Sequence, residues 1–237
     1  MALVRLDKLL TESGMASRSE ARKFIRDGRV AVNGLVCRQP EAKVEAAAEL
    51  TLDGESIGAG ALCLMLHKPA GVLSATEDAE QKTVLDLLPA RLRNRGYFPV
   101  GRLDKDTTGL LLLTTDGDLA HRIISPKKQV EKQYIARVDG VLTEEDVRAF
   151  AEGLVLGDGT ACLPAGLELL DGGRTARVTL TEGKYHQVKR MLASRGAPVL
   201  TLHRERIGAL RLDINLAPGE FRPLDKEEID LLFVLKN

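Results

Sequence analysis

The sequence predicts an α+β protein in which a small basic helix-hairpin domain (residues 1–57) precedes a larger domain (residues 62–237) with a mainly antiparallel sheet. Predicted strands outnumber predicted helices and do not alternate strictly with them. Residues 131–140 and 174–183 alternate apolar and polar side chains, as strands with one wetter face do. The stretch Gly-Ala-Gly-Ala at residues 58–61 is typical of a linker.

Local signals define the small domain. Leucines at helical spacing in residues 6–10 indicate a first helix. A second helix is predicted after Ser17, because Ser17 and Glu20 have the spacing of a capping box. Asn33-Gly34 suits the tight turn of a hairpin, and residues 50–57 indicate a further strand.

The second helix is predicted to carry a basic ridge opposite a buried side formed by Ala21, Phe24 and Ile25. The ridge consists of Arg18, Arg22, Lys23, Arg26 and Arg29. A charge run is usually a solvated helix face. Here one sign predominates on a small module, which favours binding to an RNA backbone. The pattern "RLDKLL…SRSEARKFIRDGRVAVNG" resembles the small RNA-binding module of a ribosomal small-subunit protein and of tyrosyl-tRNA synthetases.

The larger domain has mixed elements. "LCLMLHKPAGVLSA" (residues 62–75) indicates a buried strand that enters a Pro-Gly turn. "GLLLLT" (residues 109–114) indicates a strand covered on both faces. Helices are predicted over residues 117–125, 143–153, 185–196 and 225–236.

Composition argues against several classes of protein. No apolar run approaches the ~20 residues that span a bilayer, and charges interrupt the first apolar residues, so we expect a cytoplasmic protein. Cys37, Cys63 and Cys162 lack the paired spacing of a zinc site or a disulfide framework, and the four histidines are scattered. No metal is expected.

The acidic loop "GRLDKDTTG" beside a buried strand is the strongest candidate site. Asp104 could accept backbone hydrogen bonds in a turn, bind Mg²⁺ together with Asp106, or act as a catalytic carboxylate. The residues alone favour the turn.

A resemblance that covers nearly the whole chain changes this interpretation. "GRLDKDTTGLLLLTTDGD" is similar to the signature loop of pseudouridine synthases, which detach uracil from ribose and reattach it through a ring carbon. "HKPAGV", "EKQY" and "EGKYHQVKRML…LHRERIG" match further landmarks of the family in order. The last of these resembles most the branch that modifies small-subunit ribosomal RNA.

The resemblance implies roles for three residues. Asp104 is then the catalytic carboxylate, either as a nucleophile or by electrostatic and proton-transfer assistance. Burial disfavours an ionised carboxylate, and Lys189 matches the cation that offsets this, with Arg190 as the fallback. Tyr134 matches the tyrosine whose ring stacks on the target uracil and whose hydroxyl is positioned for removal of a proton from the uracil ring. The ordinary alternatives are a solvent-facing helix charge and a core tyrosine.

The resemblance also implies contacts with RNA. The uridine must be flipped out of the helix, and Arg102 matches the side chain that fills the vacated space, unless it forms a salt bridge. Asp106, Thr107 and Thr108 are expected to shape the loop, with the threonine hydroxyls and Gly109 fixing its backbone. Predicted phosphate contacts are Lys68, Lys132, Lys184 and Arg204.

An isomerisation without change of oxidation state needs no NAD, flavin, ATP or metal, so no cofactor is expected. The predicted partner is small-subunit ribosomal RNA or its assembly intermediate, and a monomer is expected. Three alternatives stay open: a sister enzyme for large-subunit ribosomal RNA, a non-catalytic RNA-binding assembly factor, and a glycosidase-like hydrolase.

Overall fold

A computed structural model describes residues 3–12, 16–45, 48–57 and 63–234. The chain divides into two compact units: residues 1–62 with 88–97, and residues 63–87 with 98–237. The predicted linker at residues 58–61 lies outside the described residues. The predicted domain boundaries stay predictions.

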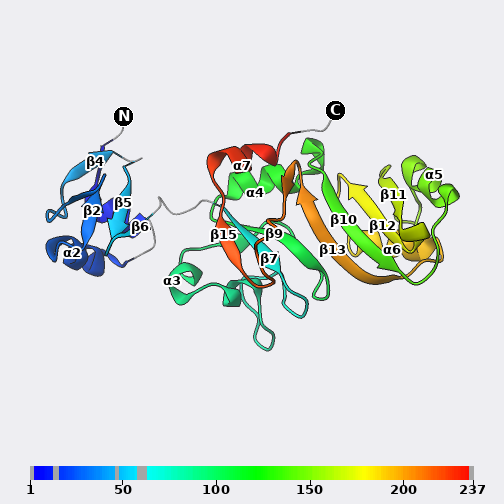
Figure 1. The fold of residues 1–237 in the computed structure, drawn as a ribbon, viewed down its shortest axis with the longest axis horizontal. Coiled ribbons are helices and arrows are strands. Elements are labelled where there is room, and N and C mark those ends of the chain that lie inside the picture. The colour runs from blue at the N-terminus through cyan, green and yellow to red at the C-terminus, as the bar shows by residue number, and fades with distance from the viewer. Residues whose placement is uncertain (1–2, 13–15, 46–47, 58–62, 235–237) are drawn as a thin grey trace. The chain divides into compact units, whose positions relative to one another are not determined.

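The first unit contains helices α1 (Leu6–Glu12) and α2 (Arg18–Arg26) (Figure 1). The predicted capping box is present at the start of α2. The Ser17 backbone N–H donates to the Glu20 carboxylate at 2.9 Å, and the Glu20 backbone N–H donates to the Ser17 hydroxyl at 3.4 Å. A short helix, α3 (Ala90–Arg93), lies in the second segment of this unit.

Two small sheets complete this unit. The strands are β1 (Leu3–Arg5), β2 (Val30–Val32), β3 (Leu35–Val36), β4 (Lys43–Glu45), β5 (Leu50–Leu52) and β6 (Glu55–Ile57). One sheet has the order β3-β2-β5-β6, and β1 pairs with β4. The hairpin turn is at Asn33-Gly34, where both φ angles are positive (49° and 80°), as predicted. The core consists of Leu6, Leu10, Ala21, Ile25, Val30 and Leu50, while Phe24 is only partly buried.

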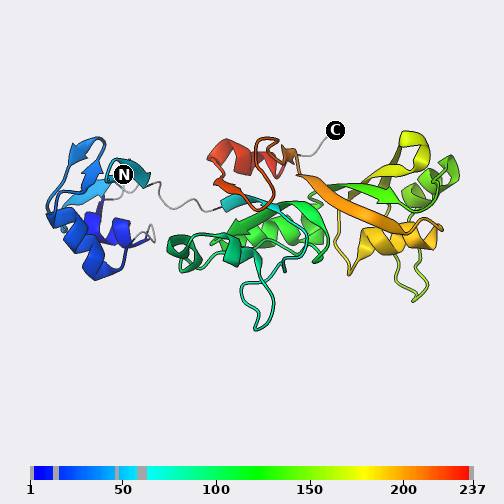
Figure 2. The same ribbon diagram turned by 60° about the horizontal axis from the view of Figure 1, so that its bottom comes forward.

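The second unit is built on one nine-stranded sheet (Figures 1 and 2). Its strands are β7 (Cys63–Lys68), β8 (Phe98–Pro99), β9 (Thr108–Thr114), β10 (Lys132–Val138), β11 (Gly166–Leu170), β12 (Thr175–Leu180), β13 (Val199–Ile207), β14 (Leu210–Arg211) and β15 (Phe221–Pro223). The main order is β11-β12-β10-β13-β9-β7-β15, with β14 paired to β13 and β8 to β9. Of these pairings only β9–β13 is parallel, which confirms the predicted α+β class with a mainly antiparallel sheet.

Hydrophobic clusters lie along this sheet. Helices α5 (Glu144–Glu152) and α6 (Gln187–Ser194) pack on β10, β11 and β12 through residues such as Phe150 and Met191. Helices α4 (Gly117–Ile124) and α7 (Lys226–Leu231) contribute to a further cluster, which contains Cys63 and Met65 of β7 and Leu110 and Leu112 of β9. No described helix is both long and apolar enough to cross a membrane.

The parallel pair β9–β13 joins these two halves beside the acidic loop. One row of residues crosses the sheet here in the order Lys68, Gly109, Arg204 and Tyr134. Gly109 has a φ of +107°, and a Cβ atom there would lie 2.3 Å from the Arg204 carbonyl oxygen. Only glycine therefore fits at this crossing.

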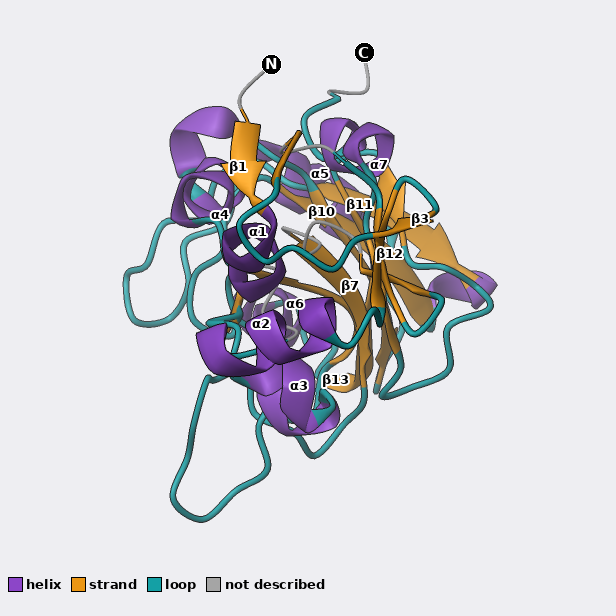
Figure 3. Cartoon of the chain, turned by 90° about the vertical axis from the view of Figure 1, so that its left-hand side faces the viewer, coloured by secondary structure: helices purple, strands orange, loops and turns teal. Residues whose placement is uncertain are grey.

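Loops and turns make up most of the segment between β7 and β9, drawn teal in Figure 3. Helix α6 begins at Gln187, two residues later than predicted, because His186 adopts a left-handed backbone (φ 48°, ψ 34°). That single residue turns the chain into the helix and places its ring at the candidate site.

Candidate active site

The acidic loop is fixed through its backbone. The Leu103 N–H donates to the Ser74 hydroxyl oxygen at 3.0 Å, and that hydroxyl donates to the Leu103 carbonyl at 2.8 Å. The Thr107 N–H donates to the Asp104 carbonyl at 3.1 Å, which closes a turn. Asp104 thus occupies the predicted turn, while its carboxylate stays available for other partners.

Lys68, at the end of β7, fixes the same loop through hydrogen bonds to its backbone carbonyls. Its side chain is fully buried, and its Nζ donates to the carbonyl oxygens of Pro69 (2.9 Å), Lys105 (3.2 Å) and Thr107 (2.9 Å). Burial lowers the pKa of Lys68 to about 8, although the nearby carboxylates of Asp106 and Asp104 oppose this. The predicted phosphate contact of Lys68 is wrong, because backbone carbonyls occupy its three donors.

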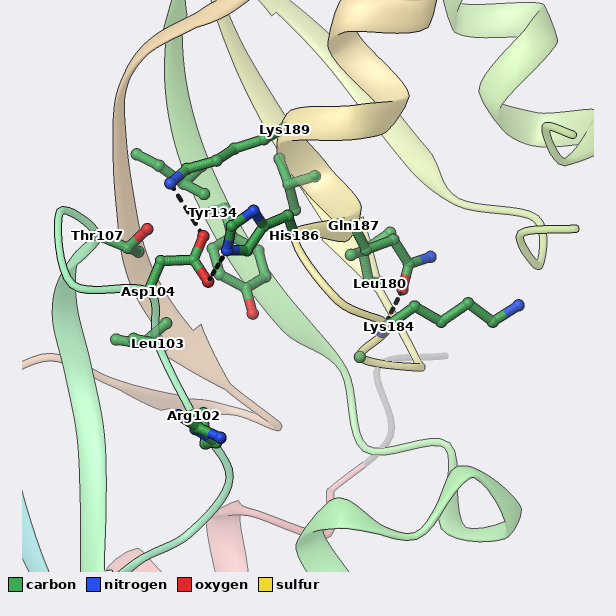
Figure 4. A pocket seen from close by; sticks show the side chains of 13 residues that line it. Arg102, Leu103, Asp104, Thr107, Tyr134, Leu180, Lys184, His186, Gln187 and Lys189 are labelled. Atoms are coloured by element: carbon green, nitrogen blue, oxygen red, sulfur yellow. Dashed lines mark hydrogen bonds and ion pairs between the residues drawn. The ribbon is translucent and has the colours of Figure 1, made fainter. Parts of the chain in front are cut away.

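Lys189, from helix α6, binds two carboxylates of the loop, and Figure 4 shows its ion pair with one of them, Asp104. Its Nζ lies 2.9 Å from Asp104 Oδ2 and 2.6 Å from Asp106 Oδ1. Burial would lower the pKa of Lys189, but hydrogen bonds to Asp106 and Asp104 outweigh burial and raise it. The hydrogen bond from Lys189 lowers the pKa of Asp106. Arg190, the fallback cation, instead pairs with Asp158 at 2.5 Å.

His186 is a further neighbour of Asp104 that the sequence reasoning did not single out. Its Nε2 lies 3.4 Å from Asp104 Oδ1, and its ring stacks on that of Tyr185 with 3.8 Å between the ring centroids. Its place in "YHQVKRM", three residues before Lys189, could have suggested a second contact from the same turn.

Tyr134 reaches the site from β10 and lies against Arg204 of β13. The Arg204 Nη1 donates to the Tyr134 hydroxyl at 3.4 Å, and its Nε donates to the Leu110 carbonyl at 2.7 Å. Arg204 is only 4% exposed, and its Nη2 has no hydrogen-bond partner among the described residues. This burial contradicts the predicted phosphate contact of Arg204.

A pocket with an empty volume of about 440 Å³ brings these groups together. Asp104, Tyr134 and Lys189 line it, with apolar walls from Leu180, Val188 and Leu202 and exposed Arg102 at the loop. The buried Thr107 hydroxyl also lines it, without a hydrogen-bond partner in the described structure. The expectation that this hydroxyl fixes the loop is therefore wrong. Thr108 bonds His203 Nδ1 at 2.9 Å.

The remaining predicted contacts are dispersed. Lys132 donates to the Ile123 carbonyl at 3.2 Å, and burial, aided by the charge of Arg204, lowers its pKa to about 8. Lys184 is exposed at the pocket and lies 3.3 Å from Glu182. Among the described residues no cluster of His, Cys, Asp and Glu could hold a metal ion.

The predicted ridge on α2 is largely exposed, but two of its cations are paired. Arg22 bonds Asp7 at 3.1 Å, and Arg29 bonds Asp53 at 2.5 Å. The other three, Arg18, Lys23 and Arg26, form no ion pair with another described residue.

Comparisons with known proteins decide the family. Residues 63–194 match the model of RNA pseudouridylate synthases, and residues 4–50 match the S4 domain. The chain belongs to the RNA pseudouridylate synthase family. This membership confirms the predicted isomerase and its combination with a small N-terminal domain.

Relatives of this synthase match it almost end to end. An uncharacterized RNA pseudouridine synthase of Bacillus subtilis is 44% identical over 97% of this chain and 98% of its own length. The ribosomal small subunit pseudouridine synthases A of Pasteurella multocida and Escherichia coli are 43% and 40% identical, each over 95% of this chain and 98% of the relative. A solved pseudouridylate synthase is 38% identical with a TM-score of 0.68, and the alignment covers 97% of this chain and 99% of that structure.

Proposed function

We propose that this synthase converts a uridine of small-subunit ribosomal RNA into pseudouridine and that Asp104 is its catalytic carboxylate. The observation that carries the proposal is the 2.9 Å ion pair between Asp104 and Lys189 in the pocket that Tyr134 also lines. The relatives named ribosomal small subunit pseudouridine synthase A support the choice of RNA. A cytoplasmic monomer remains part of the same proposal.

The reaction requires one group to stay beside the sugar while the base turns. The bond from ring nitrogen to the sugar breaks, a bond from ring carbon to the sugar forms, and the proton of that carbon is replaced by one on nitrogen. Asp104 either attacks the nucleoside or stabilises the electron-deficient intermediate. In both versions the carboxylate acts as an anion, and the Lys189 ammonium 2.9 Å away is its counterion.

Tyr134 supplies the second half of this mechanism. Its ring stacks on the extruded uracil, and its hydroxyl relays a proton: the oxygen accepts the proton of the ring carbon as the hydroxyl gives up its own proton to the ring nitrogen, directly or through water. The guanidinium of Arg204 donates to that hydroxyl at 3.4 Å and so orients the oxygen for this transfer. Arg204 thus acts through Tyr134 as a positioning residue.

RNA binding divides between the two units in this proposal. Arg102 enters the space that the flipped uridine leaves, and Lys184 contacts a phosphate at the pocket. Lys132, whose ammonium is partly buried, is retained as a weaker phosphate contact. The cations of α2, chiefly Arg18, Lys23 and Arg26, add affinity without taking part in the reaction.

Asp104→Asn tests the catalytic role, with Asp106→Asn as the matched control. Tritium release from 5-tritiated uridine in transcribed small-subunit RNA should fall by at least about 10³-fold for Asp104→Asn, while RNA binding persists. Activity of Asp104→Asn equal to that of Asp106→Asn would reject the assignment and favour a non-catalytic assembly factor.

The choice of RNA needs its own measurement. Both ribosomal RNAs, incubated with and without the protein, are treated with carbodiimide and mapped by reverse-transcription stops. We expect a new stop in small-subunit RNA only. A stop in large-subunit RNA alone would identify the sister activity, and release of free uracil would identify a hydrolase.

A further inference from the structure

Tyr185 stands out on a chain that has few aromatic residues. Phe, Trp and Tyr make up 3% of the sequence, and there is no Trp. Among the described aromatic side chains Tyr185 is the exposed one, at 76%, whereas Tyr97 is buried and Tyr134 half-buried. An exposed tyrosine on an otherwise polar surface can provide stacking area for a ligand with a flat ring.

One face of the Tyr185 ring is already fixed. It stacks on the ring of His186 with centroids 3.8 Å apart and planes 17° from parallel. The left-handed backbone of His186 is an unfavourable conformation that its surroundings must hold. Because His186 also lies 3.4 Å from Asp104, the pair of rings is anchored to the catalytic loop and leaves the other face of Tyr185 to solvent.

The position of Tyr185 relative to the pocket suggests what this open face meets. Tyr185 lines an open cleft, with an empty volume of about 1380 Å³, that also holds Asp104, Arg102 and Lys184. It lines a second hollow together with Arg190 and Asp158. A strand of RNA whose uridine enters the pocket must continue past this rim.

We propose that Tyr185 is a stacking platform for an unpaired RNA base next to the uridine that enters the pocket. This inference rests on the proposed function and extends it to a binding site for a second nucleotide. Flipping one nucleotide exposes the faces of its neighbours, and aromatic side chains bind such faces with little dependence on base identity. The cations Arg102 and Lys184 in the same cleft suit the adjoining phosphates.

Steady-state kinetics of tritium release on transcribed small-subunit RNA provide the first test. Tyr185→Ala should raise KM by about 5- to 140-fold, the range expected for one stacked base, with the change in KM rather than in kcat. Tyr185→Phe, which keeps the ring, should restore KM toward the value of the unmodified enzyme. An unchanged KM in Tyr185→Ala, or an equal loss in Tyr185→Phe, would overturn the platform.

A direct readout uses the absence of Trp. Tyr185→Trp introduces a single fluorophore, whose emission should be quenched when transcribed small-subunit RNA is added. Val141→Trp, at an exposed position between β10 and α5, is the matched control and should change little. Equal quenching at both positions, or none at Tyr185→Trp while the RNA binds, contradicts stacking.

The two proposals fail in different ways. If the unmodified enzyme releases tritium but the Tyr185 variants show neither a higher KM nor quenching, the platform is wrong and the proposed function stands. If the unmodified enzyme releases no tritium from this RNA, the proposed function is wrong, and the platform for a base beside that uridine is rejected with it.

Discussion

Two lysines contact the Asp104 loop, one from β7 and one from α6, and they lie in opposite electrostatic environments. On the β7 side, Lys68 is fully buried, bonds only backbone carbonyls, and has a pKa lowered to about 8. On the α6 side, Lys189 lies between two carboxylates, which raise its pKa. Lys68 therefore positions the loop, whereas Lys189 balances the charge of the reacting carboxylate.

Removal of the Lys189 contact on the α6 side should have the largest effect on kcat. Lys189→Met leaves Asp104 without its ammonium partner, and we expect kcat to fall by about 10²–10³-fold, as when a preorganised electrostatic contact is removed. Single-turnover tritium release measures this. Arg190→Met is the matched variant on the same helix and should cost no more than about fivefold, because an exposed pair contributes ~0–1 kcal/mol. Equal losses would remove the distinction between the two cations.

Removal of the Lys68 contact on the β7 side should mainly lower the stability of the fold. Lys68→Met leaves buried carbonyl groups of the loop without donors, and we expect the free energy of unfolding in urea to fall by about 1–3 kcal/mol. Lys105→Met is the control in the same loop, because the Lys105 ammonium donates to the exposed Gln81 side chain rather than to buried carbonyl groups. A similar loss in both variants would contradict the role given to Lys68.

The lowered pKa of Lys68 also determines whether its contribution to folding stability rises or falls with pH. Between about 8 and the ordinary value of 10.5, the unfolded chain binds the proton that the folded chain has released. The resulting contribution to stability is therefore complete above pH 10.5 and is lost as pH falls through about 8. Unfolding measured across this window should show the unmodified chain gaining stability relative to Lys68→Met as pH rises.

Asp106 allows a finer test of the α6 side. Its carboxylate is 75% exposed, so its pair with Lys189 is well solvated. We expect Asp106→Asn to lower kcat by at most about fivefold, because Lys189 keeps Asp104 as a partner. A loss as large as that of Lys189→Met would show instead that Asp106 orients the ammonium.

The cations of α2 should have the smallest effect on the reaction itself. The double variant Lys23→Ala, Arg26→Ala should lower the slope of log affinity against log salt by about 1.4–1.8, with kcat unchanged. These two residues are preferable to Arg22, whose loss would also remove one of the hydrogen bonds to Asp7. Arg148→Ala on α5 is the control, and an unchanged slope in the double variant would exclude a phosphate contact at α2.

Much of the fold follows from local pattern, because capping boxes, turns and alternating strands are encoded within a few residues. The strand β13 is an instructive exception that was not predicted. Two of its inward positions, Arg204 and Arg206, are occupied by buried arginines, so hydropathy shows no alternation of the usual kind. Arg204 donates to the Leu110 carbonyl and Arg206 to the Gly208 carbonyl, so backbone contacts hold both buried side chains.

The candidate site was predictable only in part. The contact between Lys189 and Asp104 came from the resemblance, because residues 85 positions apart give no local signal. Lys68 and Arg204 were interpreted as phosphate contacts because a sequence shows a cation but not the carbonyl beside it. Sheet register determines that neighbour, and register depends on the whole fold.

The junction at Gly109 makes the geometry of the site a property of the entire sheet. Asp104 precedes β9 on one side of the junction, whereas Tyr134 and Lys189 come from the other side. A change of twist between the two halves therefore alters the separation of the carboxylate from the phenol and the ammonium together. The sheet acts as a rigid frame that holds reacting groups from distant parts of the chain in register, so substitutions far from the pocket that loosen this frame should slow the reaction without touching RNA.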